Sequence, residues 1–227
     1  MSAAAGQDRT MMSSCPVKAA AQVTSALAVL AMLLVSGCGA LRSDAEPERI
    51  YVLNPAMAAA TAPPTGGLLM VSRPAVQPGL DTPRIALKRA DNELDYYALS
   101  RWSGTLPQIL GAFAVQSLQD AFTTVTGSDR GAGPADFDLL LTVRHFEAVS
   151  PQDGGAPEIH VAFQCLLMAT APRRVLGSCD AEAREQAQGN RMAAIVAAFE
   201  RAAQRAMADV RNQVTAAARS AAAQPRR

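Results

Sequence analysis

The chain contains two histidines, and both belong to segments with strand-like alternation. His145 and Glu147 are two positions apart, so they lie on the same face of an extended strand. A hairpin with its turn at Asp153-Gly154 brings His160 opposite Glu147. Imidazole and carboxylate groups placed in this way could bind a metal ion or transfer protons. A zinc site needs three or four converging ligands, however, and a cross-strand charged pair on a solvated face explains the residues more simply, so we expect no metal and no cofactor.

Other catalytic patterns are missing from the sequence. No G-x-S-x-G elbow, H-E-x-x-H helix, P-loop or G-x-G-x-x-G follows a strand. Cys165 is a poor candidate nucleophile, because apolar neighbours would raise the pKa of its thiol. The sequence therefore predicts a protein that is not an enzyme. A lipid-modifying enzyme stays an alternative, and it would require a nucleophile and a base within hydrogen-bond reach of each other.

The cysteine with the clearest chemistry is Cys38. Lys18 provides a positive charge, residues 19–35 form an uncharged and largely apolar run, and two small residues follow. The sequence Val35-Ser36-Gly37-Cys38 looks like the lipobox of bacterial lipoproteins. We therefore expect residues 1–37 to be removed as a signal peptide and Cys38 to carry the acyl chains. The alternative is a simple membrane anchor, or a buried apolar helix that ends in a cysteine by chance.

Residues 38–49 are polar beyond the cysteine and lack periodicity, so we expect a lipidated tether between membrane and domain. Two or more acyl chains hold a protein on a bilayer durably, whereas one does so only marginally. Residue 39 is Gly rather than Asp, which resembles the pattern of Gram-negative lipoproteins forwarded to the outer membrane. The expected location is therefore the outer membrane, with the domain facing the periplasm.

Two further cysteines remain in the mature chain, Cys165 and Cys179. An even pair in an exported domain suggests a disulfide. Pairing two strands around a turn near Pro172 sets the two cysteines opposite each other on an apolar face. A slip of two residues would keep the faces and separate the sulfurs, so a disulfide and two separate buried thiols both stay open.

Charge and length limit the classes of partner and the number of domains. The chain has 21 Lys and Arg against 20 Asp and Glu, and no basic patch, so a nucleic-acid partner is not expected. The mature length suits one domain. We place this domain at residues 50–217 and expect residues 218–227 to form a disordered tail, because they offer little apolar surface to bury.

Periodicity predicts the elements of this domain. One amphipathic helix starts at the capping pattern of Thr105 and Gln108 and runs to about residue 122, and a second covers about 190–216. We expect strands at residues 50–53, 68–72, 85–88, 94–99, 137–149 and 159–170, and a last strand after Pro172. We take 127–135 as a flexible connection.

Aromatic and arginine residues gather in one block. Its candidate partner-binding residues are Arg73, Tyr96, Tyr97, Arg101 and Trp102. Tyrosine, tryptophan and arginine are enriched in the energetically dominant parts of protein interfaces. The alternative is that these side chains close the sheet edge against the first helix.

The same block resembles a known family. The opening IYVL strand, RPAVQPGLDTPRIAL, LDYYALSRWSGTLPQIL with its helix, the two long hairpins and the closing helix are similar to the ABC-type transport auxiliary lipoprotein component family, which includes the PqiC-like lipoproteins. The resemblance covers roughly residues 50 to 215. The positions that match the family pattern are Arg73, Pro74, Arg84, Tyr96, Arg101, Trp102, Leu106 and Pro107, with Cys38 at the acylated position.

The resemblance implies a fold and a function. The fold would be α/β of the α+β type, a single domain with a mixed, mostly antiparallel sheet packed by two helices. Family members accompany an ABC transporter and a substrate-binding subunit of the mammalian-cell-entry (MCE) type, which are thought to move phospholipids between membranes. An envelope assembly or scaffold lipoprotein without a transport role is the alternative. The oligomeric state stays open, and a homo-oligomer is possible.

Overall fold

The structure is a computed structural model that describes residues 46–55, 63–89, 91, 93–128, 133–151 and 153–223. The compact unit begins at Pro47. Its elements in chain order are β1 (Arg49–Tyr51), β2 (Thr65–Val71), β3 (Ala75–Val76), the 3-10 helix η2 (Pro78–Leu80), β4 (Arg84–Lys88), β5 (Leu94–Trp102), α2 (Leu106–Leu118), β6 (Phe122–Gly127), β7 (Phe137–Val149), β8 (Glu158–Thr170), β9 (Arg173–Gln186) and α3 (Met192–Ala223).

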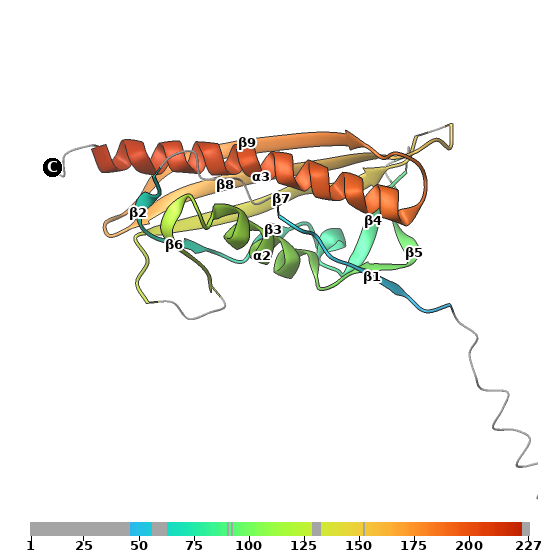
Figure 1. Ribbon diagram of the computed structural model, residues 1–227, viewed down its shortest axis with the longest axis horizontal. Helices are drawn as coiled ribbons and strands as arrows, with labels where there is room; N and C mark the ends of the chain where they lie inside the picture. The colour runs from blue at the N-terminus through green and yellow to red at the C-terminus, as the bar shows by residue number, and fades with distance from the viewer. Residues whose placement is uncertain are drawn as a thin grey trace, which may run out of the picture. The chain divides into compact units, whose positions relative to one another are not determined.

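Strand β7 connects the two parts of the sheet (Figure 1). On one side β8 pairs with it in antiparallel orientation, and β9 pairs antiparallel with β8. On the other side β2, β3 and β4 each pair in parallel with a short part of β7. β6 then pairs with β2, while β5 pairs with β4 and carries β1 at its outer side. The expected α+β fold, a mixed sheet with two helices, is confirmed for the described residues.

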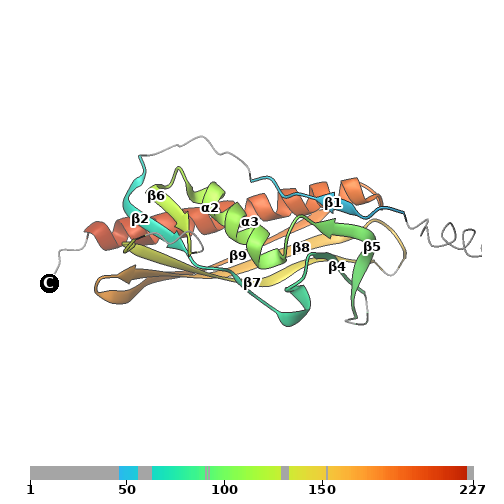
Figure 2. The same ribbon diagram turned by 90° about the horizontal axis from the view of Figure 1, so that it is seen from below.

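Alternation of side chains explains how the long strands bury one face. In β8, Val161, Phe163 and Leu167 are almost inaccessible, whereas Gln164 is exposed. Helix α3 runs along β8 and β9 and covers this apolar face (Figure 1). The shorter α2 lies beside α3 and also contacts β6 and β2 (Figure 2). Both helices thus shield the sheet with their apolar stripes.

Three aromatic rings join the two parts of the sheet to α3. Trp102 at the end of β5 contacts Phe199 of α3, with ring centroids 5.4 Å apart, and Phe146 of β7 at 6.0 Å, both in edge-on arrangement. Phe146 and Phe199 also stack on each other at 5.1 Å. All three rings are essentially inaccessible to solvent. Such aromatic pairs add about 0.5–1.5 kcal/mol each beyond the burial of their area.

The register of the first long hairpin holds near its turn and then shifts. Glu147 faces His160 as the sequence predicts. A bulge between Val143 and His145 changes the pairing by one residue. Leu140 therefore faces Leu166, whereas a register without the bulge predicts Leu167 as its partner. A bulge adds one residue to a single strand, and the apolar character of both partners conceals it in the sequence.

Two element boundaries also differ from the sequence prediction. α2 ends at Leu118, and the residues 122–127, expected as the end of a helix and the start of a loop, form strand β6. Its sequence FTTVTG is rich in β-branched residues, which favour a strand.

The expected disordered tail is wrong for residues 218–223, because α3 continues to Ala223 and Ala218 is fully buried. A close approach explains this burial. A Cβ atom added to Gly177 of β9 would lie 2.9 Å from Cβ of Ala217, so the glycine lets the helix pack directly on the strand.

In the part of the chain that the structure describes, no helix is long and apolar enough to span a membrane.

A disulfide links β8 to β9. Cys165 lies directly opposite Cys179, and the structure joins their sulfurs, with 5.0 Å between the two Cα atoms. Both side chains are buried on the face that α3 covers. This distance lies within the usual range for a disulfide.

Replacing Trp102 by Ala tests the aromatic contact. We expect Trp102→Ala to lower the free energy of unfolding by about 3–5 kcal/mol, because it leaves a cavity between β5, β7 and α3. Denaturant unfolding measures the change. Val175→Ala is the control, since Val175 is 55% exposed and should cost less than about 0.5 kcal/mol. Equal effects of the two substitutions would contradict a core role for Trp102.

Removing the disulfide should lower the stability of the domain. The bond closes a loop with a sequence separation of 14, so the Cys165→Ala, Cys179→Ala double variant should lose about 2–4 kcal/mol of stability. Peptide mapping of the exported protein without reductant should recover the two cysteines in one linked peptide pair. Recovery of both as free thiols would refute the bond.

Candidate functional site

The predicted partner-binding block divides into core and surface residues. Trp102 is only 1% exposed, so it cannot present its ring to another protein, and a docking role for it is wrong. Tyr96 also has a structural contact, because its hydroxyl donates a hydrogen bond of 2.7 Å to the carbonyl of Gly79 in η2. The guanidinium of Arg84 lies 3.9 Å from the centre of the Tyr96 ring, a cation–π contact that fixes the same ring.

Tyr97 and Arg101 stay closer to the surface. Tyr97 is half-buried, and burial raises the pKa of its hydroxyl to about 12. Arg101 is paired with Glu48, with 2.8 Å between Nε and the carboxylate, and the Arg101 side chain is 37% exposed. It stands beside Ile50 in the parallel pairing of β1 and β5. These contacts tie the first described residues of the domain to β5.

The surface around Arg101 carries apolar side chains that the sequence analysis missed. Ile50 and Val52 are each 56% exposed, and Leu99 is 47% exposed. We call these three residues the edge patch. Leu99 has φ of 52°, in the left-handed region that non-glycine residues rarely adopt, at an irregular part of the pairing between β4 and β5. Sequence patterns could not reveal the edge patch, because an apolar residue in a strand normally predicts burial.

Arg73 lies in a different place, at a groove of about 530 Å³ between α2 and the ends of β2 and β6. The lining residues are Val71, Ser72, Arg73, Pro74, Pro107, Gln108, Gly111, Ala112, Val115, Gln116, Gln119, Gly127 and Ser128. Arg73 is the one charged residue among them, and it faces Asp81 at 3.7 Å. Ser72 donates a hydrogen bond to the carboxylate of Asp138. Because the two histidines of the chain lie on other parts of the sheet, the groove offers these hydroxyls no imidazole base.

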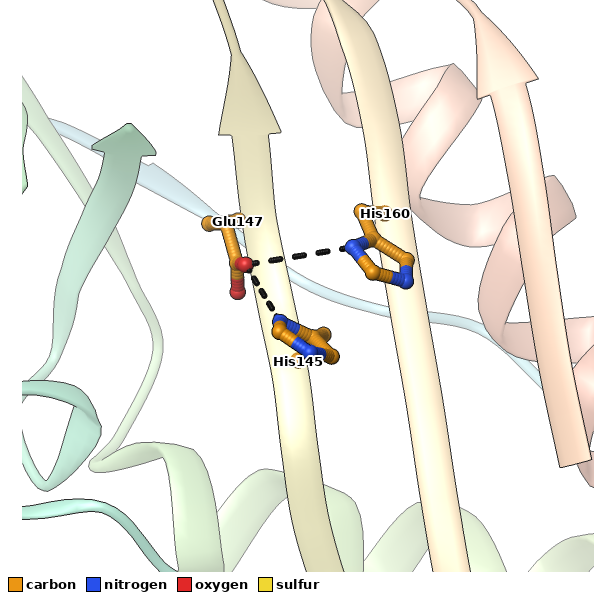
Figure 3. Close-up of side chains that lie close together, drawn as sticks. All are labelled: His145, Glu147 and His160. Atoms are coloured by element: carbon orange, nitrogen blue, oxygen red, sulfur yellow. Dashed lines mark hydrogen bonds and ion pairs between the residues drawn. The ribbon is translucent and has the colours of Figure 1, made fainter. Parts of the chain in front are cut away.

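The two histidines and Glu147 lie close together on β7 and β8 (Figure 3). His160 and Cys165 are separated by an odd number of positions along β8, so the cluster lies on the face opposite the disulfide. Nδ1 of His145 lies 2.7 Å from Oε1 of Glu147, and Nδ1 of His160 lies 4.0 Å from the same oxygen. The other oxygen of Glu147 accepts a hydrogen bond of 2.6 Å from the backbone N–H of Phe146. The rings of His145 and His160 are stacked, with centroids 4.1 Å apart.

These groups are less exposed than the sequence analysis expected. Glu147 is 5% and His160 is 8% exposed, so the solvated face predicted for them is wrong at these two positions. Burial lowers the pKa of His160, and the neighbouring His145 and Arg184 act in the same direction. We call His145, Glu147 and His160 the histidine–glutamate cluster.

Strand β9 adds a charged layer beside the cluster. Nε2 of His160 lies 2.9 Å from the carboxylate of Glu182, and Arg184 donates to that same carboxylate at 3.0 Å. The hydrogen bond from Arg184 lowers the pKa of Glu182. Arg184 also reaches Glu158 at 3.4 Å. This arrangement could bind a cation or hold a proton, and the described residues around it supply no nucleophile.

The remaining predicted site residue is Cys38. It lies outside the described residues, as do the whole of the signal peptide and most of the tether. Their assignment therefore rests on the sequence pattern described above.

Comparisons with known proteins place the chain among others of this fold. It is similar to protein XCC0632 from Xanthomonas campestris, with 21% identity and a TM-score of 0.69 over 78% of this chain and 100% of that chain. It is also similar to an uncharacterized protein, with 16% identity and a TM-score of 0.58 over 74% and 99% of the two chains. At these identities the likeness concerns the fold alone. Among proteins with curated descriptions, none matches significantly.

The family comparison covers most of the domain. A family model described as ABC-type transport auxiliary lipoprotein component matches residues 51–211. This range extends from β1 to α3 and includes the edge patch, the groove and the histidine–glutamate cluster, apart from Ile50. Because the match spans well over half of the sequence, the chain belongs to the ABC-type transport auxiliary lipoprotein component family.

Proposed function

We propose that this lipoprotein is anchored by lipid in the outer membrane, faces the periplasm and serves as the auxiliary subunit of an ABC transport system. Its partner would be an MCE-type subunit, and the cargo would be phospholipid moved between the two membranes in support of envelope integrity. The observation that carries the proposal is the family match over residues 51–211. It is supported by the lipobox-like sequence that ends at Cys38.

The anchor limits where the domain can act. β1 begins at Arg49, so a short polar tether separates a lipidated Cys38 from the folded unit. A random-coil chain of about eleven residues has an average end-to-end distance of roughly 18 Å. The N-terminal edge of the sheet would therefore stay close to the membrane surface, in reach of a partner that approaches that membrane.

We assign the docking surface for the MCE-type subunit to the edge patch together with Tyr97 and Arg101. β1 stands at the end of the strand order among the described residues, the position at which a strand from another protein could extend the sheet. Exposed apolar side chains and an arginine stand next to this edge. The left-handed conformation of Leu99 costs about 1–2 kcal/mol, and such strain is concentrated at functional positions.

The arrangement supports a binding role in preference to catalysis. Hydroxyl groups in the groove have carboxylate or backbone partners, and the histidine–glutamate cluster has no adjacent nucleophile among the described residues. An envelope scaffold without a transport role would use the same anchor with different partners. Crosslinking in cells followed by purification of the full-length lipoprotein distinguishes the two, since only the transport role predicts an MCE-type subunit among the products.

Lipidation is tested by mass spectrometry of the mature protein. We expect an N-terminus at Cys38 with a mass increase that corresponds to acyl chains. Cys38→Ala should accumulate as the unprocessed precursor, because cleavage of this kind of signal depends on the cysteine. A mature protein that starts at another residue without modification would contradict the assignment.

Docking is tested by Leu99→Gly. Glycine adopts positive φ without the Cβ clash, so the variant should keep its stability within about 1 kcal/mol of the wild type. Loss of the side chain should weaken binding to the co-purified MCE-type subunit about tenfold, which corresponds to ~1.4 kcal/mol.

The matched control for docking is Val175→Gly. Val175 is also an exposed apolar strand residue, but it lies near the turn between β8 and β9, at the other end of the sheet from β1 (Figure 1). It should leave affinity unchanged. Unchanged affinity in a stably folded Leu99→Gly variant, or equal losses in both variants, would refute docking at the edge patch.

A further inference from the structure

We propose that the histidine–glutamate cluster binds one divalent transition-metal ion, with Zn²⁺ as the best match. His145, Glu147 and His160 each offer a ligand atom, and these atoms all lie within 4.8 Å of one another (Figure 3). The two histidines are the only ones in the whole sequence. Two imidazoles and one carboxylate are a ligand set that zinc sites commonly use.

The hydrogen bonds of His160 fix which of its nitrogens is free. Nε2 lies 2.9 Å from the carboxylate of Glu182, and a carboxylate only accepts hydrogen bonds, so Nε2 carries the hydrogen. The guanidinium of Arg184 is farther from Nε2, at 3.5 Å, and is itself bound to Glu182 at a shorter distance. In the neutral ring Nδ1 then has a lone pair, and it is directed toward Glu147 (Figure 3).

That lone pair faces a second acceptor. Oε1 of Glu147 is 4.0 Å from Nδ1 of His160, beyond hydrogen-bond distance, and the His160 residue is only 8% exposed. Two electron-rich atoms that face each other in a buried place repel unless a positive charge lies between them. The charge can be a proton or a metal ion, and 4.0 Å leaves room for an ion bound at about 2.0–2.2 Å from each atom.

Glu147 supports the same conclusion. Its carboxylate is 5% exposed, and among the described residues its ion-pair partners are the two histidines, without any Lys or Arg. A buried carboxylate without a permanent cation is costly. Nδ1 of His145 lies 2.7 Å from Oε1 of Glu147, so without an ion this nitrogen donates its hydrogen to the carboxylate. A bound divalent ion would balance the charge of Glu147, and the hydrogen of His145 would move to Nε2 so that Nδ1 can bind the ion.

The pair of His160 and Glu182 also has the form of an outer ligand shell. Histidines that bind metal through one ring nitrogen commonly donate the other N–H to a carboxylate, which fixes the orientation of the ring. Glu182 occupies this place, and Arg184 in turn fixes Glu182 through a hydrogen bond of 3.0 Å. The chain of hydrogen bonds from His160 through Glu182 to Arg184 is the arrangement expected around a metal ligand.

One ring must turn for an ion to bind. The rings of His145 and His160 differ by 15° in plane, so their Nδ1 atoms lie in two nearly parallel planes and do not yet point at one common position. His145 can turn, because its side chain is 36% exposed and its residue follows the bulge in β7. Solvent at His145 would supply the fourth ligand. The ion would then clamp β7 to β8 on the face opposite the disulfide.

The experiment uses the full-length lipoprotein in detergent, treated with chelator and then titrated with Co²⁺ and Zn²⁺. We expect about one ion per chain and the visible absorption of four-coordinate Co²⁺, displaced by Zn²⁺. Glu147→Gln and His160→Gln should each weaken Zn²⁺ binding at least ~100-fold, and Glu182→Gln about tenfold. Asp180→Asn is the matched control, because Asp180 is an exposed carboxylate on the same strand two residues from Glu182, and it should leave affinity unchanged.

Circular dichroism checks that each variant is folded. If either buried substitution prevents folding, His145→Gln replaces it, since its side chain is partly exposed, and the same loss of affinity is expected. The proposal is overturned if the wild type shows no four-coordinate Co²⁺ spectrum, or if a folded cluster variant and Asp180→Asn bind Zn²⁺ as tightly as the wild type does. Because these readouts involve no partner protein, they are independent of the proposed transport role.

Discussion

The packing of Trp102 against Phe146 and Phe199 is the interaction on which the rest of the structure depends. It joins the end of β5, the middle strand β7 and the long helix α3, which are distant in sequence. Each ring is almost completely buried. The short strands share one buried core with the long hairpins, and these three rings are among its largest fully buried side chains. The position of β1 and of the edge patch therefore depends on a core contact that lies beneath them.

This arrangement separates the buried face of the sheet from the surfaces for which we propose functions. One face of β7, β8 and β9 is occupied by α3 and contains the disulfide, so it is closed to partners. The opposite face carries the histidine–glutamate cluster, and the N-terminal edge carries exposed apolar residues beside Arg101. The proposed docking of a partner at this edge agrees with an auxiliary role in transport. The family to which the chain belongs supports the same interpretation.

The sequence predicted features that rest on local patterns. Strict alternation located the hairpins, and it set Cys165 opposite Cys179 and Glu147 opposite His160. Alternation failed to predict the register beyond the bulge after Val143, because one extra residue shifts the pairing and the partners are apolar in either register. The sequence also named Trp102 as a candidate partner-binding residue, with closure of the sheet edge as the alternative, because composition alone does not distinguish an interface aromatic from a core aromatic. The burial of Glu147 and His160 depends on contacts between neighbouring strands, which no periodicity in a single strand can reveal.

The most direct test of the account is photo-crosslinking in living cells from single positions of the full-length lipoprotein. A photoreactive residue at position 50, where Ile50 is 56% exposed, should form an adduct with the MCE-type subunit. The same residue at position 175, which is equally exposed near the turn between β8 and β9, should not form that adduct. Adducts with an MCE-type subunit from position 175 alone, or from position 50 only with other envelope proteins, would contradict the account.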